Sequence, residues 1–195
     1  MSSQCPEAIV LAAALVLAMS AAGVAHVLWL KSRFSRRLAW PLDGGVAWRG
    51  KRLFGANKQV RGLVAMPPAA ALAFAVLGAV HGRWPVASCG LWDFDAGRYA
   101  VVGFACGLAF MLAELPNSFL KRRLGIAPGE APSGWLKGPC LLLDRIDSTL
   151  GVLAAASLLA PVPLATWGWM LLMGPASHAA FSAWLFHARV KARAL

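Results

Sequence analysis

The feature that most constrains this chain is a long apolar run near its beginning. Residues 9–30 contain no Asp, Glu, Lys or Arg, and at about 1.5 Å per residue a helix of this length crosses the hydrocarbon core of a bilayer. No basic segment precedes the run, and it is too long for a signal-peptide core, so we expect a membrane span and not a cleaved leader. The runs 63–80, 99–115 and 164–186 have the same character, and a shorter apolar run covers 146–160.

The composition agrees with a membrane protein. Hydrophobic residues make up 59% of the 195 residues and charged residues only 14%, whereas a soluble domain carries about 25% charged residues. The four cysteines are scattered, without the spacing of a disulfide framework or a zinc site. We therefore predict an all-α, polytopic membrane protein: one integral-membrane domain, residues 1–195, with about five transmembrane helices joined by loops 31–62 and 116–145.

The distribution of basic residues predicts the orientation. The chain has 19 Lys and Arg against 8 Asp and Glu. Seventeen of these basic residues fall in loop 31–62, in loop 116–145 and in the C-terminal tail, and only Arg83 and Arg98 fall elsewhere. The positive-inside rule then places the N-terminus outside and the C-terminus in the cytoplasm, in the cell (inner) membrane. Because topology explains the basic residues, we expect no nucleic-acid partner.

Two aspartates stand at the start of the short fourth run. Asp144 and Asp147 are three residues apart, which places both carboxylates on one face of a helix. Two such oxygen ligands suit one or two Mg²⁺ ions. A pair that caps the helix N-terminus, where the macrodipole favours negative charge, is the alternative. The spacing alone leaves both readings open.

Basic and amide side chains form two clusters on the predicted cytoplasmic side. Cations and amides in glycine-rich surroundings are suited to bind a magnesium-bound triphosphate. The alternative is that the basic residues only orient the chain in the membrane by the positive-inside rule. The segment 127–139, with three prolines and three glycines, is expected not to form a regular helix, and it is a flexible linker or a lid. The members of the two clusters are Asn57, Lys58 and Arg61, and Asn117, Ser118, Lys121, Arg122 and Arg123.

Four blocks of the sequence resemble the CDP-archaeol synthase family, whose members are membrane-embedded, CTP-dependent cytidylyltransferases. The last block is also similar to the aspartate signature of bacterial CDP-diacylglycerol synthases. The run from Asn117 to Ile126 is the most specific of the four. The blocks are Pro-Leu-Asp-Gly-Gly at 41–45, Phe-Gly-Ala-Asn-Lys-Gln-Val-Arg-Gly at 54–62, Glu-Leu-Pro-Asn-Ser-Phe-Leu-Lys-Arg-Arg-Leu-Gly-Ile at 114–126 and Asp-Arg-Ile-Asp-Ser at 144–148.

The resemblance implies transfer of CMP from CTP to the phosphate of a two-chained, phosphatidate-like or archaetidic-type lipid in the bilayer. Under it, Asp144 and Asp147 hold Mg²⁺, while Lys121 and Arg122 complete the catalytic set. Asp43 and Glu114 support the metal or the basic clusters. The nucleotide and phosphates are bound by Asn57, Lys58, Arg61, Asn117, Ser118 and Arg123. The residues leave open ester-linked or ether-linked lipid chains, and a monomer or a homodimer.

Two other functions are weighed against this one. A CDP-alcohol phosphotransferase would consume CDP-lipid, but its aspartates are spaced by three residues, and those at 144 and 147 are spaced by two. A non-catalytic transporter or anionic-lipid-binding protein would not need the carboxylates. Transporters place polar groups near mid-bilayer, whereas these are expected at one edge.

Overall fold

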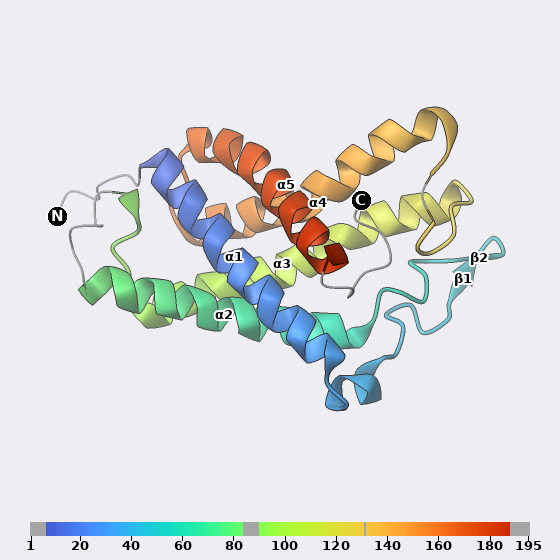
Figure 1. Ribbon diagram of the computed structural model, residues 1–195, viewed down its shortest axis with the longest axis horizontal. Helices are drawn as coiled ribbons and strands as arrows, with labels where there is room; N and C mark the ends of the chain where they lie inside the picture. Colours follow the sequence, from blue (N-terminus) through green and yellow to red (C-terminus); the bar gives the residue numbers. More distant parts are fainter. Residues whose placement is uncertain (1–6, 84–89, 131, 188–195) are drawn as a thin grey trace.

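Five long α-helices dominate the computed structural model, which describes residues 7–83, 90–130 and 132–187 (Figure 1). The short elements are the 3₁₀ turns η1 (Phe34–Leu38) and η3 (Gly134–Leu136) and an antiparallel pair of strands, β1 (Ala47–Trp48) and β2 (Lys51–Arg52). The five helices are α1 (Ala8–Lys31), α2 (Val60–Arg83), α3 (Ala96–Arg123), α4 (Lys137–Leu159) and α5 (Leu164–His187).

The described residues confirm an all-α, polytopic membrane protein. Among them, α1, α2 and α3 are long and apolar enough to cross a membrane by length and composition. Helices α4 and α5 complete the bundle, and the count of five spans stays a prediction. Three basic residues of the tail, which supported the predicted orientation, lie outside the described residues: Arg189, Lys191 and Arg193.

Small residues let α2 and α3 pack closely. A Cβ added to Gly103 would lie 2.6 Å from the Ala70 carbonyl oxygen, and one added to Gly107 would lie 2.8 Å from the Met66 carbonyl oxygen. Glycines four residues apart on one helix face are a recurrent device for bringing transmembrane helices together. This contact fixes α3, which carries much of the site described below, against α2.

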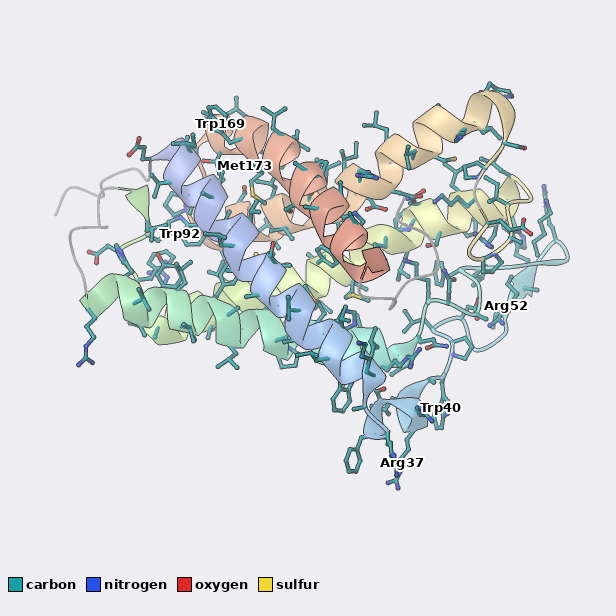
Figure 2. The ribbon with its side chains drawn as sticks, in the orientation of Figure 1. Arg37, Trp40, Arg52, Trp92, Trp169 and Met173 are labelled. Atoms are coloured by element: carbon teal, nitrogen blue, oxygen red, sulfur yellow. The ribbon has the colours of Figure 1, made fainter. Side chains whose placement is uncertain are left out.

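The end of the bundle away from loops 31–62 and 116–145 is closed by a loop rich in aromatic residues. Trp92 donates its ring N–H to the Pro161 carbonyl oxygen at 2.7 Å, and the Tyr99 hydroxyl donates to the Trp92 carbonyl oxygen at 3.0 Å. Asp95 caps α3, and the hydrogen bond from the Arg98 amide lowers the pKa of its carboxyl group. Figure 2 labels Trp92 at this end. These polar groups stabilise the loop and lie apart from the predicted site.

Helices occupy most of the predicted loop 116–145. Helix α3 continues through Pro116 to Arg123, and α4 begins at Lys137, nine residues before the expected start at 146. Pro139 lies in the first turn of α4, where an N–H has no partner within the helix and its loss costs little. The expectation that no part of 127–139 is a regular helix was therefore wrong for residues 137–139, and η3 covers 134–136.

Candidate active site

Polar side chains of α3 and α4 meet where the two helices lie side by side. The Asn117 amide nitrogen donates to Asp144 Oδ1 at 2.7 Å and to Asp147 Oδ2 at 2.8 Å. Lys121 forms an ion pair with Asp144. Residues three or four apart share a helix face, so 117 and 121 on α3 can both face 144 and 147 on α4. The structure thus brings together two predicted metal ligands and two predicted substrate-binding residues.

A second ion pair extends this network to the segment before α2. Lys58 pairs with Glu114 on α3. The Ser148 hydroxyl lies 3.2 Å from Glu114 Oε1 and 3.1 Å from Asp147 Oδ1, close enough to hydrogen-bond to either carboxylate. Ser148 was not among the predicted site residues, and its position directly after Asp147 was the signal available. Two lysines from separate segments therefore reach one chain of carboxylates.

The members of this polar network differ in exposure. Asn117, Asp147 and Ser148 are buried, whereas the Asp144 side chain is 41% exposed. A buried carboxylate is costly unless hydrogen bonds satisfy it, and Asp147 receives them from Asn117 and Ser148. Asp144 is thus the more accessible of the two carboxylates to a ligand.

A cavity of about 350 Å³ adjoins the network and extends among all five helices. Its polar lining includes Asn57, Lys58, Arg61, Glu114, Asp144 and Arg145. Its apolar lining includes Val16, Met19, Met66, Phe110, Val152 and Met170. Phe110 lies about one turn deeper in the bundle than Glu114 on α3, and Val152 lies about two turns deeper than Asp144 on α4. One cavity therefore offers cations at one end and an apolar surface at the other.

Asp43 organises the loop that precedes Asn57. Its buried carboxylate pairs with Arg52 and accepts hydrogen bonds from the amides of Gly45 and Gly55 at 3.0 Å and of Phe54 at 3.2 Å. Burial acts to raise the pKa of this carboxyl, but these four donors outweigh it and hold the pKa well below its usual range. Asp43 thus stabilises its own loop, and its support of the metal or of the basic clusters stays a prediction.

Arg123 lies away from the carboxylates. It donates to the carbonyl oxygens of Trp48, Lys51 and Arg52, the latter two at 2.7 and 2.8 Å. The Trp48 ring stacks on Phe119 with 6.0 Å between ring centroids. These contacts fasten the β1–β2 hairpin to α3, so the geometry gives Arg123 a structural task in place of the expected phosphate contact.

Ser118 and Arg122 occupy a further face of α3. Both are buried, at 9% and 8% exposure, and neither is among the cavity-lining residues. Among the described residues, nothing accepts a hydrogen bond from Nε or Nη1 of Arg122. A buried guanidinium with free donors is suited to an anion, but the geometry does not join it to the Asp144 network.

The donor set at 117, 144 and 147 fits a hard divalent cation. Among the described residues, no group of three or more His, Cys, Asp and Glu side chains is arranged so that it could hold a metal ion by itself. Asp144 and Asp147 nevertheless converge on a single nitrogen atom, and among the described residues no donor reaches the buried Asn117 Oδ1. A half-turn of the Asn117 amide would exchange its nitrogen for its oxygen and turn Oδ1 toward the carboxylates. Two carboxylates and an amide oxygen are then ligands that Mg²⁺ accepts, with water and phosphate oxygens completing its coordination.

Comparisons with known proteins agree with the predicted resemblance. No protein-family model matches the chain. The CDP-archaeol synthase of Halorubrum lacusprofundi is 33% identical over 116 residues, which are 59% of this chain and 58% of that protein. The match therefore spans less than two thirds of that relative. A solved intramembrane enzyme for archaeal membrane lipids biosynthesis aligns with a TM-score of 0.59 and 28% identity, over 86% of this chain and 90% of the other. The predicted resemblance is confirmed.

Proposed function

We propose that this chain is a membrane-embedded cytidylyltransferase that transfers CMP from CTP to the phosphate of a two-chained lipid. An oxygen of the lipid phosphate attacks the α-phosphorus of CTP. The new P–O bond forms as the bond to the bridging oxygen breaks, and pyrophosphate leaves with that electron pair. The products are CDP-lipid and pyrophosphate. Support comes from the similarity to a CDP-archaeol synthase and from the site geometry.

The observation that carries the proposal is the continuous polar network beside a cavity with an apolar end. A lipid phosphate needs cations for its headgroup and an apolar surface for its chains. A triphosphate needs cations together with carboxylates that can hold a metal. The cavity and its polar border offer both in one place. In order, the network consists of Lys58, Glu114, Ser148, Asp147, Asn117, Asp144 and Lys121.

The residues of the site have separate tasks in this reaction. The lipid phosphate is itself the nucleophile, so catalysis consists of positioning and charge neutralisation. Lys58, Arg61 and Lys121 bind phosphate oxygens, and Arg145 joins them because it lines the cavity. The predicted nucleotide contacts of Asn57 and Ser118 and the predicted catalytic role of Arg122 remain part of the proposal.

Magnesium belongs to the same proposal. Asp144 and Asp147, with the Asn117 amide oxygen, would hold one or two Mg²⁺ ions. When bound, the metal would neutralise charge on the pyrophosphate that leaves. The two lysines that pair with carboxylates of the network then face the same phosphates as the metal does.

We also propose that the site faces the cytoplasm, with the N-terminus outside, because CTP is a cytoplasmic nucleotide and the site-bearing segments are basic. The lipid reaches the cavity from within the bilayer. The apolar lining accepts hydrocarbon of either ester-linked or ether-linked chains, since neither linkage is distinguished by contacts with Met and Val side chains.

The test uses the full chain in detergent with CTP, Mg²⁺ and either phosphatidate or an archaetidic-type lipid phosphate. Formation of CDP-lipid and pyrophosphate is expected. Asp144→Asn and Asp147→Asn should each lower turnover more than a hundredfold, since a lost charge contact at a phosphoryl site costs about 3 kcal/mol. Asp93→Asn, at an exposed carboxylate outside the network, is the matched control and should leave turnover unchanged.

Two outcomes would contradict the proposal. If Asp144→Asn and Asp147→Asn both keep turnover within about threefold of the wild type, these two residues are not the metal ligands. Release of CMP from CDP-lipid with an alcohol acceptor, without reaction of CTP, would indicate a CDP-alcohol phosphotransferase instead.

A further inference from the structure

The 3₁₀ turn η1 exposes aromatic and basic side chains together. Phe34 and Trp40 are each 69% exposed. Arg33, Arg36 and Arg37 are exposed beside them. Figure 2 shows Arg37 pointing away from the helices at this corner of the molecule. Large exposed aromatic rings interleaved with cations are unfavourable on a surface that meets only water. We therefore expect the side chains around η1 to contact a binding partner.

The position of this turn is fixed by hydrogen bonds to α1. The buried Ser35 hydroxyl lies 3.0 Å from the carbonyl oxygens of both Leu30 and Ser32, and the Ser35 amide donates to Ser32 Oγ at 3.2 Å. Only Ser32 and Arg33 separate η1 from the end of α1. Because α1 is long and apolar enough to span the membrane, η1 is held at the level where that span leaves the hydrocarbon.

The same segment is joined to the candidate active site. The Trp40 carbonyl oxygen accepts from the Val60 amide at 2.9 Å, and the Leu42 amide donates to the Lys58 carbonyl oxygen at 2.8 Å. Pro41 and Gln59 form a bridge between these two bonds. The backbone that carries Lys58 is therefore paired directly with the backbone that follows η1.

We propose that Phe34, Trp40, Arg36 and Arg37 form an interfacial anchor that docks on anionic phospholipid headgroups of the leaflet around the site. Aromatic rings favour the headgroup level of a bilayer, and arginine binds phosphate oxygens through paired N–H groups. The anchor holds the backbone segment 58–60 at headgroup depth and concentrates anionic lipid near the cavity. This proposal goes beyond the cytidylyltransferase reaction and does not depend on it.

Photocrosslinking of the full chain tests the anchor. The photoreactive residue p-benzoylphenylalanine replaces Phe34 or Trp40, in vesicles of equal phosphatidylcholine and phosphatidylglycerol. The phosphatidylglycerol headgroup is a phosphodiester without the nucleophilic phosphomonoester, so turnover does not interfere. The control position is Trp48, which is 50% exposed but stacks on Phe119, beyond the predicted membrane span of α3.

The expected result is lipid adducts at 34 and 40 at least about fivefold more frequent than at 48. One basic side chain near an anionic surface strengthens binding about fivefold, so these adducts should be enriched in phosphatidylglycerol. The double variant Arg36→Gln with Arg37→Gln should lower the share of phosphatidylglycerol among the lipid adducts toward its share in the vesicle. Arg49→Gln with Lys137→Gln removes the same charge from other segments and should keep the enrichment.

Several results would overturn the anchor. One is an adduct frequency at 34 and 40 that does not exceed that at 48. Another is a lipid preference that survives the loss of Arg36 and Arg37. Adducts mainly with a second copy of the chain would identify the surface as a protein interface and would also refute lipid docking.

Discussion

Gly23 offers a direct test of whether lipid chains occupy the cavity. It lies on α1, lines the cavity, and a Cβ added there would meet no described atom within 4 Å. The Cβ of Gly23→Leu therefore has space around it, and we expect the rest of the leucine side chain to occupy part of the cavity. In a helix interior leucine is also favoured over glycine, by close to 1 kcal/mol. We expect the variant to fold at least as stably as the wild type and to lose space for the lipid.

The size of the effect follows from the atoms displaced. A leucine side chain adds four carbon atoms, which would displace about as many methylene groups of a lipid chain. At about 0.8 kcal/mol for each buried methylene, the loss is about 3 kcal/mol, or more than a hundredfold in kcat/KM for the lipid. The KM for CTP should change little, because we propose that CTP binds at the polar end of the cavity.

The assay measures kcat/KM for long-chain and short-chain lipid phosphates with the wild type, with Gly23→Leu and with a control variant. Short chains that do not reach Gly23 should restore turnover of Gly23→Leu. Gly168→Leu is the matched control: Gly168 is exposed on α5, and a Cβ there also meets no described atom within 4 Å. A long-chain kcat/KM of Gly23→Leu within threefold of the wild type would refute the placement of the lipid.

Three further predictions concern hydrogen bonds and packing. Ser148→Ala should lower kcat about tenfold or more, since a hydrogen bond to a carboxylate contributes about 1.5–3 kcal/mol; Ser157→Ala, exposed on the same helix, should not change it. Asp43→Asn should lower Tm at neutral pH because it leaves Arg52 without its ion pair. The pKa of Asp43 is lowered on folding, so its stabilising effect is present above its ordinary pKa of about 4 and is lost as pH falls through the lowered value. The Tm difference from Asp43→Asn should therefore shrink in strong acid. Gly107→Val should lower Tm by several degrees, because overpacking typically costs about 1–3 kcal/mol.

Hydropathy predicted the helices well because the bilayer requires backbone hydrogen bonds to be satisfied within each span. All five expected helices form, and α1, α2 and α3 satisfy the criteria for a span. Helix ends outside the hydrocarbon are not constrained in this way. Hydropathy does not predict where a helix ends outside the apolar layer. It therefore missed the extension of α3 to Arg123 and the start of α4 at Lys137.

The run from Lys121 to Arg123 shows why the site was predicted only in part. The sequence suggested one basic cluster, but consecutive residues of an α-helix point about 100° apart. Lys121 accordingly faces Asp144, Arg122 is buried on another face, and Arg123 holds the hairpin. The partners of each side chain depend on which helix packs against which face, and a single sequence does not contain that information.

The start of α4 argues against a capping role for Asp144 and Asp147. Capping requires a carboxylate at the helix N-terminus, and its interaction with the dipole fades within the first turn. Leu136 occupies the N-cap of α4, which places Asp144 and Asp147 about two turns or more inside the helix. Aspartate has a low helix propensity at such positions, and burial of Asp147 adds a desolvation cost. Neither local helix stability nor solubility accounts for the pair, so its position favours a ligand-binding role shared with Asn117.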